Sequence, residues 1–147
     1  MKAESPTQRR PHASMVIVVS ALVLAACSAE GPELGAVYGK VTMDGQPVPH
    51  AQLSFEPEGP GRAATGLADA KGEYKLDYSP TAEGALVGPV IVRISTLTAV
   101  SPETIPPKYN TKSELKRKVE SGSNEINFEL ESGGWKSKAR PAEVQSL

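Results

Sequence analysis

The chain has 147 residues, which suffices for one domain of ordinary size rather than two. Its 13 prolines and 13 glycines exclude a protein built from long helices, because each proline inside a helix costs about 3 kcal/mol. A formal net charge of −1 gives no basic surface of the kind that binds nucleic acid, so we expect no nucleic-acid partner. The single cysteine excludes an internal disulfide framework and a zinc site built from cysteines.

The first 26 residues predict a secretory signal peptide. Lys2, Arg9 and Arg10 precede an apolar run from Met15 to Ala26 that only Ser20 interrupts. These 12 residues span about 18 Å as a helix, which is too short for a bilayer core of about 30 Å. A basic start followed by a short apolar run is typical of a signal that is removed from the mature protein.

The end of this run, Leu24-Ala25-Ala26-Cys27, resembles the lipobox of bacterial lipoproteins. The resemblance implies that Cys27 carries a diacylglycerol and further acyl chains such as palmitate, and that the chain is cut just before it. Residues 27–34 then form a lipidated tether to a membrane, with the protein in the cell envelope, facing the periplasm or the exterior. The alternative is an incidental cysteine beside an ordinary signal-peptide cleavage site.

Residues 35–131 predict one all-β domain, because apolar residues alternate with polar ones between closely spaced turns. About seven short strands are expected, centred on residues 37–43, 51–56, 64–68, 74–78, 90–94, 115–119 and 126–130. Strands with one apolar face each must pack as two sheets, so we expect a single Greek-key β-sandwich, with a barrel as the alternative. Residues 132–147 lack a strand pattern and predict a flexible tail, made basic by Lys136, Lys138 and Arg140.

Six segments of this domain, taken in order, resemble carboxypeptidase regulatory-like domains, which have the transthyretin-like (prealbumin-like) sandwich. The segments are 39–49, Leu53-Ser54-Phe55-Glu56-Pro57, 65–74, 88–94, 105–110 and 122–130. The third segment has one residue more than the family pattern before Asp69, and Val90 replaces a tyrosine in the fourth. The last two segments are similar to a subgroup of short, single-domain envelope lipoproteins, and the resemblance implies such a protein here.

The histidines argue against catalysis, and we expect no enzyme. His12 lies in the signal peptide, which leaves His50, in a turn, as the one imidazole base of the mature chain. A transthyretin-like hydrolase is therefore a remote alternative, and a zinc peptidase lacks its histidine ligands. The stretch Asp69-Ala70-Lys71-Gly72 is too poor in acids for calcium and predicts a plain turn. No metal or other cofactor is expected.

A structural or ligand-binding role remains, and three residues are candidate contacts for a partner. Lys108 and Tyr109 lie in the proline-rich loop Ile105–Asn110, and Trp135 is the only tryptophan. The partner class is an envelope protein or a polysaccharide, and the alternative function is a carbohydrate- or peptide-binding module. Lys112, Lys116, Arg117 and Lys118 are a basic cluster that suits either an anionic partner or a solvated edge strand.

Overall fold

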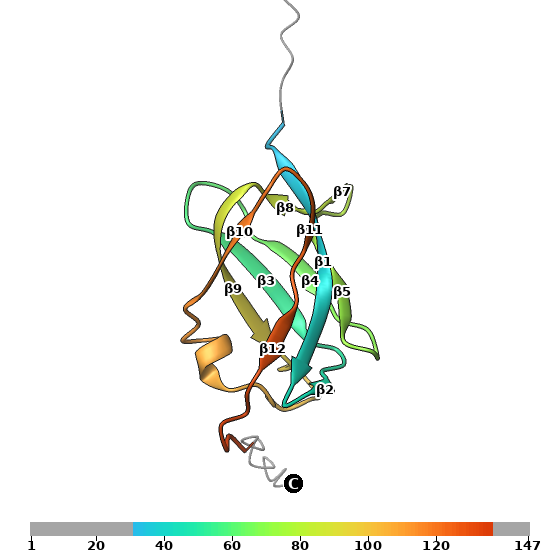
Figure 1. Cartoon of the computed structure of the whole chain (residues 1–147), viewed down its shortest axis with the longest axis vertical. Helices are drawn as coiled ribbons and strands as arrows, with labels where there is room; N and C mark the ends of the chain where they lie inside the picture. The colour runs from blue at the N-terminus through green and yellow to red at the C-terminus, as the bar shows by residue number, and fades with distance from the viewer. Residues whose placement is uncertain (1–30, 137–147) are drawn as a thin grey trace, which may run out of the picture.

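The computed structural model describes residues 31–136, which form an all-β domain of two six-stranded sheets (Figure 1). The sheets pack against each other in a sandwich-like arrangement, because one continuous cluster of buried apolar side chains draws on strands of both. The predicted fold class, an all-β domain with two layers, is confirmed at this level.

The first sheet is organised around β1 (Leu34–Met43), with which every other strand of that sheet pairs. The partners are β2 (Gln46–Pro47), β5 (Glu73–Lys75), β8 (Ala85–Leu86), β11 (Gly122–Glu125) and β12 (Phe128–Leu130). β11 and β12 run parallel to β1 along one of its edges, and the other three strands are antiparallel to it. Gly39 allows the backbone of β1 to lie close to the backbone of Ile126, because a Cβ at this position would collide with the Ile126 carbonyl oxygen.

The second sheet has the strand order β10-β9-β3-β4-β6-β7, and all its neighbours are antiparallel. Its strands are β3 (Gln52–Pro57), β4 (Ala64–Leu67), β6 (Asp77–Ser79), β7 (Ala82–Glu83), β9 (Gly88–Ser95) and β10 (Leu115–Val119). β3 and β9 form the longest pairing of this sheet, in which Gln52 lies opposite Ser95 and Phe55 opposite Val92. The alternation along β3 sends Leu53 and Phe55 into the core and leaves Gln52, Ser54 and Glu56 on the outer face.

Three aromatic rings form the centre of the core. The ring centroids of Phe55, Tyr74 and Phe128 lie 6.1 to 6.5 Å apart. The Tyr74 hydroxyl donates a hydrogen bond of 2.6 Å to the carbonyl of Ile126, and burial of this side chain raises the pKa of Tyr74. Arg117 closes the core at the edge strand β10, with its guanidinium carbon 5.2 Å from the centroid of the Phe128 ring.

The seven predicted strand segments all contain strand residues, but the segment 74–78 does not form one strand. Its first half, β5, pairs with β1 in the first sheet, and its second half, β6, pairs with β4 in the second. Leu76 lies between them, fully buried, and its N–H donates to the carbonyl of Val37. Alternation identifies the apolar face of such a segment, but it does not reveal that the segment changes sheets.

The two ends of the sandwich differ in what they carry (Figure 1). The first end holds the start of β1 and the turn between β10 and β11, where Gly35 lies against Glu120. We call it the tether end, because the tether predicted for residues 27–34 leads into β1. The opposite end, called the far end, holds the turn after β1, a short 3-10 helix η1 (Pro107–Tyr109) and the residues that follow β12. Asp44 joins two of these parts, because its N–H donates to Leu130 and its carboxylate accepts the Ser132 N–H.

Candidate functional site

The far end brings together the three residues that the sequence suggests as partner contacts. Lys108 and Tyr109 lie on η1, which starts after Pro106 in extended geometry. Proline fixes φ at the first helical position and lacks an N–H, so the Pro106-Pro107 pair suits the start of this short helix. The Lys108 ammonium nitrogen lies 4.7 Å from the centroid of the Tyr109 ring. The Tyr109 hydroxyl accepts the N–H of Glu131, which attaches η1 to the end of β12.

Trp135 completes a surface that we call the end cluster: Pro106, Pro107, Lys108, Tyr109 and Trp135. A turn over 132–135 positions the indole, with a bond of 2.8 Å from the Trp135 N–H to the Ser132 carbonyl. A shallow cavity of about 460 Å³ lies between this turn and η1, lined by Pro106, Pro107, Lys108 and Trp135 among others. The indole Nε1 is buried without a hydrogen-bond partner among the described residues. Sequence separation hides this proximity, since Trp135 follows Lys108 by 27 positions.

Buried polar contacts hold η1 in place from the core side. Asn110 is buried and donates through its side-chain amide to the Ile105 carbonyl, while its own carbonyl accepts a hydrogen bond from Arg93. Ser113, also buried, donates to the carbonyl of Val92 in β9. The end cluster therefore rests on a fixed support, which lowers the entropy that a partner must remove on binding.

Glu103 organises the long loop that leads to η1. Its carboxylate accepts hydrogen bonds from the Ser95 hydroxyl, the Thr96 N–H and hydroxyl, and the Ile105 N–H. Partial burial alone raises the pKa of Glu103, but these hydrogen bonds outweigh it and hold the pKa below its ordinary value. The loop thus depends on a charged Glu103 for its shape.

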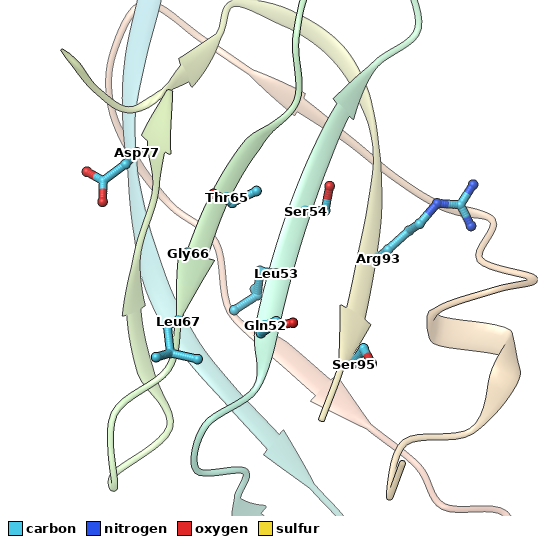
Figure 2. Close-up of a pocket in the computed structure, with 9 residues that line it drawn as sticks. All are labelled: Gln52, Leu53, Ser54, Thr65, Gly66, Leu67, Asp77, Arg93 and Ser95. Atoms are coloured by element: carbon cyan, nitrogen blue, oxygen red, sulfur yellow. The ribbon is translucent and has the colours of Figure 1, made fainter. Parts of the chain in front are cut away.

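A second hollow lies on the outer face of the second sheet, and the sequence analysis missed it (Figure 2). Its volume is about 490 Å³, and its lining residues come from β3, β4, β6 and β9: Gln52, Leu53, Ser54, Thr65, Gly66, Leu67, Asp77, Arg93 and Ser95. Arg93 lies at one side, bound to Glu56 through two bonds of 2.9 and 3.0 Å, and Asp77 lies at the other. The alternation of polar residues was visible in the sequence, but only the strand order places these four rows side by side.

The basic cluster of the sequence does not form one basic patch. Lys116 pairs with Glu58 and Lys118 with Glu120, at 2.5 and 3.0 Å. Arg117 alternates with them and covers Phe128 on the inner face, as the alternation predicts. Glu58 and Glu120 thus engage two of the four cations, Lys116 and Lys118. The inward charge of Arg117 on the edge strand β10 hinders the pairing of this strand with another chain.

The polar turns of the sequence have local structural roles. The Asp69 carboxylate accepts the N–H groups of Lys71 and Glu73 at 2.8 and 2.9 Å, and these bonds lower the pKa of Asp69. This is the turn that the sequence predicts for residues 69–72. His50 is exposed in a turn, with a positive φ of 58°, and its N–H donates to the Ala68 carbonyl. Among residues 31–136, no group of three acids, histidines or cysteines is placed to hold a metal ion.

Cys27, the predicted lipid attachment site, lies outside the described residues. Within the described part of the chain, no helix is long and apolar enough to cross a membrane. Comparison of the chain with protein-family models, with curated proteins and with solved structures finds no match in any of the three.

Proposed function

We propose that the chain is a non-enzymatic, lipid-anchored protein of the cell envelope whose sandwich presents the end cluster to a partner. The observation that carries this proposal is the placement of the two ends. β1 begins at Leu34, seven positions after Cys27, and its 10 residues extend about 33 Å towards the far end. A lipid on Cys27 holds the tether end near the membrane and directs the end cluster away from it.

The chemistry of the end cluster suits a protein or polysaccharide partner. Pro107 and Trp135, both half-buried, supply rigid apolar area, and Lys108 adds an exposed cation beside the Tyr109 ring. Tryptophan and tyrosine provide much of the binding energy at interfaces, because they bury a large area for few rotatable bonds.

The proposed domain identity is a carboxypeptidase regulatory-like domain with a transthyretin-like, Greek-key sandwich. The strand order supports it, because β3 pairs with β9 while the chain between them passes through the other sheet at β5 and β8. Such exchanges between sheets are typical of Greek-key connections. The six resembling segments span both sheets and the η1 loop.

Crosslinking in whole cells tests the orientation and the partner surface. A photoreactive residue at Lys108 is expected to give adducts with an envelope component. The matched control is the same residue at Lys118, also an exposed lysine, which lies beside Glu120 at the tether end. Equal adducts at both positions, or none at Lys108, would contradict the proposed contact surface.

The hollow of Figure 2 favours a second candidate function, the binding of a polysaccharide or an extended peptide. Gln52, Ser54, Thr65 and Asp77 line it, and their side chains make no hydrogen bond within the described residues. Thr65→Arg fills the hollow and is expected to abolish retention on purified cell-wall polysaccharide. Glu73→Arg, on the other sheet, is expected to preserve it. Equal retention of the two variants excludes the hollow as the binding site.

A further inference from the structure

The hollow of Figure 2 lies on strands that have a neighbour on both sides. Its lining residues come from β3, β4, β6 and β9, and the strand order places all four inside the second sheet. The backbone N–H and C=O groups of inner strands pair with those of the neighbouring strands. An extended peptide binds a sheet by adding a strand at an open edge, and this hollow offers no such edge. Its ligand must therefore be recognised through side chains.

One row of side chains crosses the hollow from strand to strand. In register, the row reads Asp77, Thr65, Ser54 and Arg93. Neighbouring strands lie about 4.8 Å apart, so three steps make the row about 14 Å long. Figure 2 shows the two charged residues at opposite sides of the hollow and the two hydroxyl residues between them. The row can thus contact several groups of one elongated ligand.

The middle of the hollow carries groups that both donate and accept hydrogen bonds. The hydroxyls of Thr65 and Ser54 lie in the row, and Gln52 adds an amide two residues before Ser54 on the same face of β3. The side chains of these three residues make no hydrogen bond within residues 31–136. Leu67 lies opposite Gln52 and is 60% exposed, so it adds an apolar contact. Hydroxyls and an amide beside an aliphatic side chain suit a sugar ring, which has polar edges and an apolar C–H face.

The charges of the hollow leave one carboxylate without a cation. The Arg93 Nε donates to both carboxylate oxygens of Glu56, at 2.9 and 3.0 Å, so this guanidinium already has its counter-charge. Asp77 belongs to none of the ion pairs within the described part of the chain. An exposed carboxylate without a cation attracts a positively charged group of a ligand. In a polysaccharide, that group is the ammonium of an amino sugar whose nitrogen carries no acyl group.

We propose that this hollow binds a polysaccharide with free amino groups, whose ammonium lies at Asp77 and whose hydroxyls contact Thr65 and Ser54. The inference rests on the second candidate function above and decides between its two ligands, because a site on inner strands does not suit an extended peptide. A polysaccharide of the same backbone with acylated nitrogens lacks the contact with Asp77 and binds more weakly.

Binding of two matched oligosaccharides to the full chain tests the contact with the amine. The probes are a chitosan oligosaccharide, which has free amines, and a chitin oligosaccharide of equal length, in which every nitrogen is acetylated. The native chain, in neutral detergent at a pH that keeps the amine protonated, is expected to bind the chitosan probe about tenfold more tightly in isothermal titration calorimetry. Equal affinity for the two probes, or no binding of either, overturns the proposal.

Three substitutions distinguish the amine contact from the hollow itself. Asp77→Asn preserves the size of an exposed side chain and is expected to remove the preference for chitosan without changing the affinity for chitin. Glu129→Gln, the matched control, removes an exposed acid from the first sheet and is expected to keep the preference. Thr65→Arg is expected to abolish the binding of both probes.

The outcomes separate this proposal from the polysaccharide function on which it rests. An unchanged preference in Asp77→Asn, or its loss in Glu129→Gln as well, overturns the contact at Asp77. If the native chain binds both probes equally and Thr65→Arg binds neither, the hollow is a polysaccharide site and only the inference about the amine is wrong. If Thr65→Arg binds both probes as the native chain does, the hollow is not the site and both proposals are wrong.

Discussion

Replacement of Phe55 by alanine tests the two-layer core at its centre. Phe55 is 1% exposed and contacts the rings of Tyr74 and Phe128 from the opposite sheet, with centroids 6.5 and 6.1 Å away. A buried phenylalanine truncated to alanine costs about 3–5 kcal/mol, and aromatic pairs add about 0.5–1.5 kcal/mol each beyond the area that they bury. Two such pairs place Phe55→Ala in the upper half of the range, at about 4–5 kcal/mol.

The assay is thermal and urea unfolding, followed by far-ultraviolet circular dichroism. At about 4 °C or more per kcal/mol for a domain of this size, the midpoint of Phe55→Ala is expected to fall by more than 15 °C. Tyr38→Ala is the matched control, because Tyr38 is an aromatic strand residue that is 44% exposed, and its change is expected to stay below about 1 kcal/mol. Similar losses in both variants would refute a core centred on these three rings.

Two further predictions concern the backbone and the η1 loop. Gly39→Ala is expected to lower the free energy of unfolding by about 1–3 kcal/mol, because its methyl group collides with the Ile126 carbonyl. Gly59 has open space around it, so Gly59→Ala is the control and is expected to be neutral. A chemical denaturation curve is measured for each variant, and equal midpoints contradict the close approach of β1 to Ile126. The lowered pKa of Glu103 means that its contribution to stability is present above the ordinary carboxyl pKa and is lost as pH falls through the folded-state value. The native chain is therefore expected to lose more stability than Glu103→Gln between pH 6 and pH 3, and parallel losses in midpoint refute the role given to this carboxylate.

The sequence predicts the strands of this domain well wherever an apolar residue recurs at every second position. β3 and β9 are the clearest cases, because Leu53, Phe55, Val92 and Ile94 all point inward as expected. β2, β7, β8 and β11 were not predicted, because they are two to four residues long and lack such alternation. β2, β8 and β11 pair with β1, and β7 pairs with β6, and no local pattern reveals these pairings.

The candidate contacts illustrate what the sequence does not contain. Each of Lys108, Tyr109 and Trp135 is recognisable singly, by residue type and by neighbouring prolines or glycines. Their assembly into one end cluster requires the Asp44 contacts with Leu130 and Ser132, which fix the chain after β12 against the far end. The outer hollow depends likewise on the register of β3 with β4 and β9.

Lipid attachment at Cys27 is the central claim, because it determines which end of the sandwich faces away from the membrane. Metabolic labelling of cells with radioactive palmitate, followed by purification of the chain, measures it directly. The native chain is expected to incorporate label, and Cys27→Ser is expected to incorporate none and to keep the length of the uncleaved precursor. Equal label in the two chains, or none in the native chain, would contradict the anchored orientation.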